Sequence, residues 1–152
     1  ICFNCEVNII TFWEESNRMK SKKLLIIMPC VIIVAIIGIS IWFNAPSSII
    51  NISPSEVSNI KIFNGTTGKS ITITDANEIS HIIDNLNTVS LKKDKVSLGY
   101  MGYVFRITIY KANGKEYKEF IINSKNTIRK DPFFYRDNFA SIDFDYIQQL
   151  FN

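Results

Sequence analysis

Twenty consecutive residues, from Leu24 to Phe43, contain no charged side chain and are apolar at nearly every position. At about 1.5 Å of rise per residue, a helix of this length spans roughly 30 Å, the thickness of the hydrocarbon core of a bilayer. A helix buried in a soluble domain usually carries polar residues along one face, whereas this stretch is apolar all round. The stretch therefore predicts a single transmembrane helix over residues 24–43.

Basic residues flank this stretch on one side only. Four of them lie between positions 18 and 23, whereas the next basic residue is Lys61. The positive-inside rule then predicts a cytoplasmic N-terminus and places the residues after Phe43 outside the cell. We expect a single-pass cell-membrane protein that contacts the lipid bilayer through Leu24 to Phe43.

A cleaved signal peptide is the main alternative to an anchor. Signal peptides have an apolar region of about 7 to 15 residues and a cleavage site with small residues, and this stretch is longer. Cleavage after Ala45 would place the bulky Phe43 at a position that requires a small residue. A lipoprotein site has small residues before its cysteine, whereas Cys30 is preceded by Met28 and Pro29, so a typical lipoprotein site is excluded. These observations favour an uncleaved anchor.

The first 23 residues are expected to form a cytoplasmic tail. We interpret residues 1–18 as a leader translated from sequence upstream of Met19, because Met19 begins a natural export signal. Within this leader, Cys2 and Cys5 form a CxxC pair. Such a pair without a second pair or a histidine partner is weak evidence for a zinc or redox site. No cofactor or metal is predicted.

The remaining 109 residues, from Asn44 to Asn152, are enough for one domain with a single core. They contain no cysteine, so disulfides cannot stabilise this domain. Their 13 basic and 11 acidic side chains are too balanced to suggest nucleic acid as a partner. Residues 44–58 contain two prolines and five serines and predict a flexible linker, so the domain is expected over residues 59–152.

The first half of this domain has the pattern of a hairpin followed by a helix. Residues 60–63 and 70–74 alternate in polarity around a glycine-containing loop, which predicts two strands. Asp75 is a good helix N-cap, and apolar residues at i, i+3, i+4 and i+7 from Ile79 predict one buried helical face. Residues 88–91 predict a short strand, and residues 92–95 a solvated basic loop.

The second half predicts further strands and a final helix. Asn113 and Gly114 indicate a two-residue type I′ turn, which would place Tyr110 opposite Tyr117, with Thr108 opposite Glu119 and Arg106 opposite Ile121. The alternate side chains would then form the core: Phe105, Ile107, Ile109, Phe120 and Ile122. Strands are expected at 127–130 and 133–136, and a helix at 143–151 capped by Ser141 or Asp143. The predicted class is α+β, with one mainly antiparallel sheet.

Two features resemble catalytic motifs without completing them. Residues 65–70 contain the Gly-Lys-Ser end of a phosphate-binding loop, but Phe63 replaces its first glycine and a strand is expected after Ser70. His81 is the only histidine and is expected to face solvent or the edge of the packed helix face. A pair such as Asp143 and Asp145 leaves a carboxylate-dependent hydrolase open as an alternative, although helix capping explains both residues.

Several segments resemble small exported proteins of low-GC Gram-positive bacteria that carry a domain of unknown function. The resemblance lies in residues 60–69, 78–87, 99–103 and 120–124 and covers most of residues 57–151. It implies a location in the cell envelope and transfers no catalytic or binding residue. This chain departs from those relatives that are lipoproteins, since it lacks a usable lipoprotein site.

The resulting expectation is a non-catalytic, membrane-anchored domain outside the cell that binds an unknown envelope protein or ligand. An accessory or immunity-type protein that acts with a neighbouring membrane protein is the second hypothesis. Tyrosine and arginine are enriched at binding hot spots, which nominates an interaction surface. Its candidate residues are Tyr100, Tyr103, Tyr110, Tyr117, Phe133, Phe134, Tyr135 and Arg136.

Overall fold

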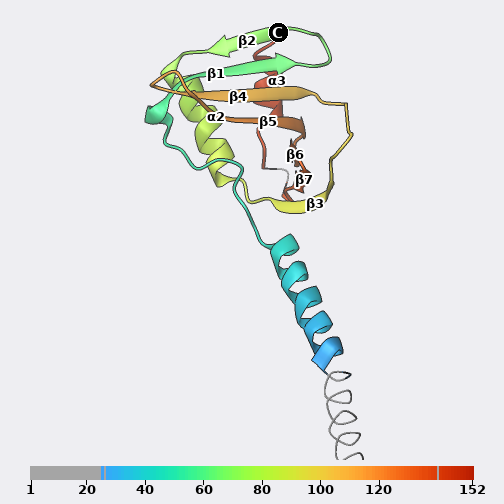
Figure 1. Ribbon diagram of the computed structural model, residues 1–152. Coiled ribbons are helices and arrows are strands. Elements are labelled where there is room, and N and C mark those ends of the chain that lie inside the picture. Colours follow the sequence, from blue (N-terminus) through green and yellow to red (C-terminus); the bar gives the residue numbers. More distant parts are fainter. Residues whose placement is uncertain (1–24, 26, 140) are drawn as a thin grey trace, which may run out of the picture. The chain divides into compact units, whose positions relative to one another are not determined.

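The computed structural model describes residues 25, 27–139 and 141–152. The chain divides into two compact units, one that ends at Phe43 and one from Asn44 to Asn152 (Figure 1). The predicted cytoplasmic tail over residues 1–23 and its CxxC pair lie outside the described residues.

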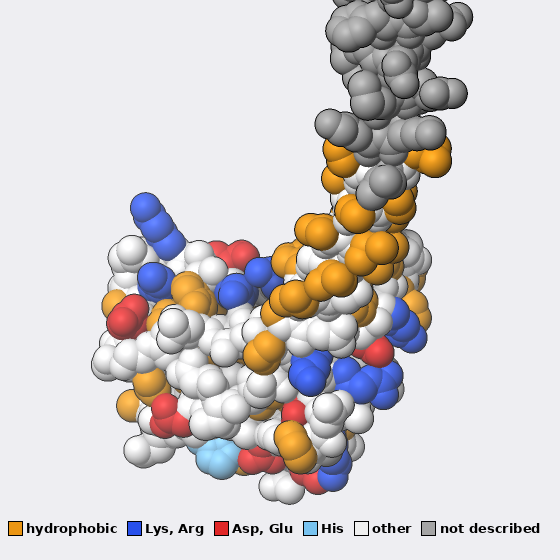
Figure 2. All heavy atoms as spheres, turned by 90° about the horizontal axis from the view of Figure 1, so that it is seen from below, with side chains coloured by type: hydrophobic (Ala, Val, Ile, Leu, Met, Phe, Trp, Pro, Cys, Tyr) orange, Lys and Arg blue, Asp and Glu red, His pale blue; other side chains and the backbone are white. Residues whose placement is uncertain are grey.

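The first unit contains an apolar helix over Ile27–Asn44 with a mean hydropathy of 2.3. Its large apolar side chains, among them Ile32, Val34 and Trp42, are exposed. Figure 2 shows the described part of this helix covered by hydrophobic side chains with no Lys, Arg, Asp or Glu among them. By length and composition this helix is a candidate membrane anchor, and a signal sequence near an N-terminus has the same properties.

The second unit is an α+β domain built on one seven-stranded sheet (Figure 1). Its elements, in chain order, are η1 (Pro54–Glu56), β1 (Val57–Asn64), β2 (Ser70–Ile73), α2 (Ala76–Thr88), β3 (Lys92–Val96), β4 (Phe105–Lys111), β5 (Glu116–Ser124), β6 (Thr127–Lys130), β7 (Phe133–Arg136) and α3 (Phe144–Gln149). The strand order is β2-β1-β4-β5-β6-β7-β3, and all neighbouring strands are antiparallel. The predicted fold class is confirmed.

Helices α2 and α3 pack on the same face of this sheet. Asp75 begins α2 as predicted, because its carboxylate accepts hydrogen bonds from the backbone N–H groups of Asn77 and Glu78. The predicted apolar face of α2 is buried, and Ile147 of α3 joins the same core. The strand residues predicted for the core are also buried: Phe105, Ile107, Ile109, Phe120 and Ile122. None of the helices described for this domain packs on the opposite face of the sheet, which we call the helix-free face.

The prediction of a flexible linker over residues 44–58 is wrong. Ile49, Ile50 and Ile52 are 3%, 1% and 5% exposed and belong to the core. The backbone of Ile52 is also hydrogen-bonded to the side-chain amide of Asn87 on α2. Prolines and serines suggested a flexible stalk, but the isoleucines between them pack this segment onto the domain, and Pro54–Glu56 forms η1.

The prediction for residues 88–95 is also wrong. Thr88 is the last residue of α2 rather than part of a strand, and the predicted basic loop forms β3. This strand lies at the edge of the sheet and pairs only with β7. Charged side chains are common on edge strands, where they discourage pairing with other chains.

The β4–β5 hairpin has the predicted register over most of its length. Thr108 opposes Glu119 and Arg106 opposes Ile121 as expected, whereas Tyr110 opposes Glu116 instead of Tyr117. The N–H of Gly114 donates to the carbonyl of Lys111, and Gly114 has a φ of 77°. The connection is therefore longer than a two-residue type I′ turn, and an extra residue in β5 shifts the pairing near the turn.

Candidate functional site

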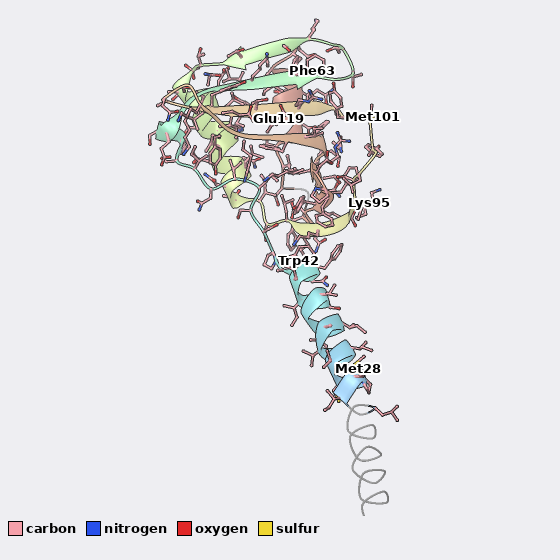
Figure 3. The ribbon with its side chains drawn as sticks, in the orientation of Figure 1. Met28, Trp42, Phe63, Lys95, Met101 and Glu119 are labelled. Atoms are coloured by element: carbon pink, nitrogen blue, oxygen red, sulfur yellow. The ribbon has the colours of Figure 1, made fainter. Side chains whose placement is uncertain are left out.

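A shallow groove on the helix-free face is a candidate binding site of the domain. It crosses the β2, β1, β4 and β5 strands and has a volume of about 220 Å³. Figure 3 labels Phe63 on β1 and Glu119 on β5, which lie on either side of β4. The residues that line the groove are Lys61, Phe63, Ser70, Arg106, Thr108, Tyr110 and Glu119.

These side chains share one face because of the alternation of the strands. Arg106, Thr108 and Tyr110 occur at every second position of β4, between the buried residues that face the helices. Lys61 pairs with Thr108 and lies between two buried isoleucines of β1, so it points to the same side. The same alternation that builds the core therefore builds the groove.

Arg106 lies at the centre of this groove and has an unsatisfied donor. Its guanidinium carbon lies 4.8 Å from the centre of the Tyr103 ring, a cation–π geometry. Its Nε is 3.9 Å from Oε1 of Glu119, too far for a hydrogen bond. This Nε is buried and has no hydrogen-bond acceptor within the described part of the chain. The Arg106 side chain as a whole is 42% exposed and lines the groove, so a ligand in the groove can reach its guanidinium group.

Tyr103 contacts two residues that line the groove, Arg106 and Phe63. Its ring centre lies 6.0 Å from that of Phe63. The loop that follows β1 also lies directly against it, since a Cβ on Gly65 would come within 2.7 Å of the Tyr103 ring. Any larger residue at position 65 would have to displace this tyrosine, so glycine is required there for packing.

The other part of the helix-free face is covered by the loop over residues 97–104. Arg129 is 7% exposed beneath this loop, and its Nη1 donates to the carbonyls of Tyr100 and Gly102 at 2.6 and 3.2 Å. The Tyr100 ring also meets Phe134 edge-on, with 5.1 Å between centres. Arg129 was not among the residues nominated from the sequence, although its position next to the core residue Ile128 would have assigned it to this face.

The eight residues nominated from the sequence do not form one surface. Tyr103 and Tyr110 lie at the groove, and Tyr100 lies on the covering loop above the buried Phe134. The others lie elsewhere: Tyr117 bonds through its hydroxyl to the backbone of Asn51, Tyr135 packs against the core, Arg136 pairs with Asp94, and Phe133 is half-buried on β7.

His81 and Asp143 form an exposed pair that joins α2 to the start of α3. His81 Nε2 lies 2.8 Å from Asp143 Oδ2, and the His81 ring lies 4.0 Å from that of Tyr146. Burial and the nearby carboxylates of Glu78, Asp75 and Asp143 raise the pKa of the Tyr146 hydroxyl. The space beside the pair has no room for a ligand.

The carboxylates considered for catalysis have structural partners. Asp143 also accepts a hydrogen bond from the N–H of Tyr146 and so caps α3, and Asp145 pairs with Lys125. Among residues 25, 27–139 and 141–152, no three His, Cys, Asp or Glu side chains are grouped closely enough to hold a metal ion.

Comparison of the chain with models of protein families, with curated proteins and with solved structures finds no match. The resemblance to exported Gram-positive proteins therefore stays a prediction. The geometry of the helix-free face carries the functional inference.

Proposed function

We propose that this chain is a membrane-anchored protein whose domain, outside the cell, binds a partner on its helix-free face and catalyses no reaction. The observation that carries this proposal is Arg106, a cation held against an aromatic ring in an open groove with an unsatisfied buried N–H. Arginine and tyrosine in such settings are the residue types most enriched at binding hot spots.

The size of the groove favours one class of ligand. Sites for drug-sized molecules usually have volumes of about 300–1,000 Å³, larger than this groove. A groove of about 220 Å³ accommodates one side chain or a short polar segment of a protein. Lys61 and Arg106 place two cations along it, next to the single carboxylate of Glu119. The ligand expected there is an acidic or carbonyl-rich segment of another protein.

The membrane anchor favours a partner in the same membrane or in the adjacent envelope. The charge asymmetry around residues 24–43 supports a domain outside the cell. A tether confines the domain to the membrane surface and raises its effective concentration for partners located there. An accessory or immunity-type protein that acts with a neighbouring membrane protein is the form of this function that the tether favours most.

Replacing Arg106 with Ala is expected to weaken partner binding by at least tenfold. Truncation of a hot-spot residue typically costs about 2 kcal/mol or more, and each 1.4 kcal/mol is a factor of ten. The measurement is quantitative recovery of co-purifying proteins from membranes by the full-length chain. Tyr110→Ala is expected to reduce recovery of the same proteins.

Arg136→Ala is the matched control, since Arg136 is an exposed arginine paired with Asp94 outside the groove. It is expected to recover the partner as the unchanged chain does. If folded Arg106→Ala recovers as much partner as the unchanged chain, the partner does not bind on the helix-free face. Equal loss in Arg106→Ala and Arg136→Ala would contradict binding on this face as well.

A further inference from the structure

The β3 strand and the loop after it expose an unusual number of large apolar side chains. Val96, Leu98 and Met101 are 59%, 72% and 87% exposed, and Tyr100 is 54% exposed. In Figure 3, Met101 lies on the outer bend of the connection between β3 and β4. Side chains of this kind, gathered within six residues, are typical of a surface that contacts a partner or a membrane.

Positive charge accompanies these apolar side chains. Lys92 and Lys95 are exposed on β3, and the only carboxylate of this strand, Asp94, is paired with Arg136 at 2.9 Å. Lys95 lies over the Phe134 ring, which the Tyr100 ring also contacts, so this lysine and the loop share one surface. Exposed apolar side chains flanked by lysines are the composition of segments that bind the interface of a bilayer.

The segment that follows the apolar helix pairs with the residue that precedes β3. The backbone N–H of Ser47 donates to the carbonyl of Leu91 at 2.8 Å, and the N–H of Leu91 donates to the carbonyl of Ser47 at 3.1 Å. Ser47 lies only three positions after Asn44, where the helix ends, and three extended residues reach at most about 10 Å. Lys92 follows Leu91 directly, so the covalent chain itself limits how far β3 can lie from the membrane.

We propose that Lys92, Lys95, Val96, Leu98 and Met101 form a juxtamembrane patch that docks on the bilayer spanned by the helix. The lysines bind the phosphates of anionic phospholipids, and the apolar side chains enter the headgroup region. Electrostatic attraction of this kind acts within about 10 Å at ordinary ionic strength, a range comparable to the reach of the short connection. This inference rests on the proposed membrane anchoring and adds a second contact with the membrane.

The test uses the full-length chain in lipid nanodiscs, with Cys2, Cys5 and Cys30 replaced by serine and an environment-sensitive fluorophore attached to Leu98→Cys. In nanodiscs that contain phosphatidylglycerol, we expect a blue-shifted emission and protection from an aqueous quencher. In nanodiscs of phosphatidylcholine alone, or at about 1 M salt, where the screening length is about 3 Å, the shift is expected to shrink or vanish.

Lys92→Gln/Lys95→Gln is expected to abolish the shift in anionic nanodiscs. The matched control is Lys69→Gln/Lys115→Gln, which removes the same charge from the loop after β1 and from the β4–β5 turn and is expected to leave the shift unchanged. Resistance to protease in each variant confirms that the domain is folded. An equal change of the emission shift in both pairs of substitutions would contradict the docking of this patch on the bilayer.

Failure of the docking and failure of the anchor are distinguishable in this experiment. A chain that enters the nanodisc but shows the same exposed emission with both lipids overturns the docking alone. A chain that does not enter nanodiscs of either composition overturns the membrane anchoring and the docking with it.

Discussion

Replacing Ile50 with Ala is expected to lower the free energy of unfolding of the domain by about 2–5 kcal/mol, the usual cost of removing a buried isoleucine side chain to its Cβ. Ile50 is 1% exposed although it lies only six residues beyond the end of the apolar helix. Its neighbour Asn51 is fixed through both backbone polar groups by the hydroxyl of Tyr117. These hydrogen bonds prevent the segment from shifting to fill the cavity that the substitution leaves, so the full cost is expected.

The measurement is pulse proteolysis in urea of the full-length chain in detergent micelles, which reports the unfolded fraction of the domain. Ser48→Ala is the control, because Ser48 is exposed two residues earlier in the same segment, and its effect is expected within about 0.5 kcal/mol. Equal urea midpoints for Ile50→Ala and Ser48→Ala would mean that residues 44–58 are a flexible linker after all.

Asp137→Asn is expected to destabilise the domain by about 2 kcal/mol at pH 7, within the range for hydrogen bonds to a charged group. Asp137 is 1% exposed in the turn after β7, and its carboxylate accepts from the N–H groups of Phe139 and Ser141 at 3.2 and 2.6 Å. Burial alone would raise the pKa of Asp137, but the hydrogen bonds from Ser141, Phe139 and Asn138 outweigh it and lower the pKa below its ordinary 3.8.

The sign of the pH dependence follows from this lowered pKa. The stability contributed by the Asp137 carboxylate is fully present above its unfolded-state pKa of about 3.8 and is lost as the pH falls through its lower folded-state pKa. The stability curves of Asp137→Asn and the unchanged chain are therefore expected to converge in acid. Asp84→Asn, at an exposed position of α2, is the control and is expected to change the curve little. A constant gap between the curves of Asp137→Asn and the unchanged chain from pH 7 down to pH 2 would refute this role.

The elements that the sequence predicted correctly are those that a local pattern determines. The helix after Asp75 has a capping side chain and a regular apolar stripe, and both act within a few residues. The alternation of β4 and β5 likewise determines which side chains face the helices. These patterns were enough for the α+β class and for most of the core.

The errors concern segments whose structure depends on distant parts of the chain. Ile49, Ile50 and Ile52 are buried because β5 and α2 provide the surface they pack against. The lysine-rich β3 is a strand because β7 offers it a pairing edge. Local composition does not show which distant surface or strand a segment will contact. The prolines and serines of residues 44–58 therefore suggested a linker, and the lysines of residues 92–95 suggested a loop.

Parts of the candidate site could be predicted from local sequence, and other parts depend on how distant residues pack. Tyr103 and Tyr110 were nominated by residue type, and alternation along β4 accounts for the position of Tyr110 at the groove. Arg106 was predicted on the correct face of β4 and was not nominated. Its significance comes from the distances to Tyr103 and Glu119, which only the packed sheet determines. Tyr117 and Tyr135 were nominated by the same criterion and are engaged in packing.

The proposed function requires the domain to lie outside the cell while the helix remains in the membrane, and one labelling experiment tests this directly. The three cysteines of the chain all lie at or before Cys30, so Lys115→Cys places a single thiol on the domain, at an exposed position of the β4–β5 turn outside the juxtamembrane patch. In intact cells, a membrane-impermeant maleimide is expected to label the full-size Lys115→Cys chain in the membrane fraction, and to leave the unchanged chain unlabelled. Labelling of Lys115→Cys only after lysis, or only on a shortened chain released from the membrane, would contradict this topology.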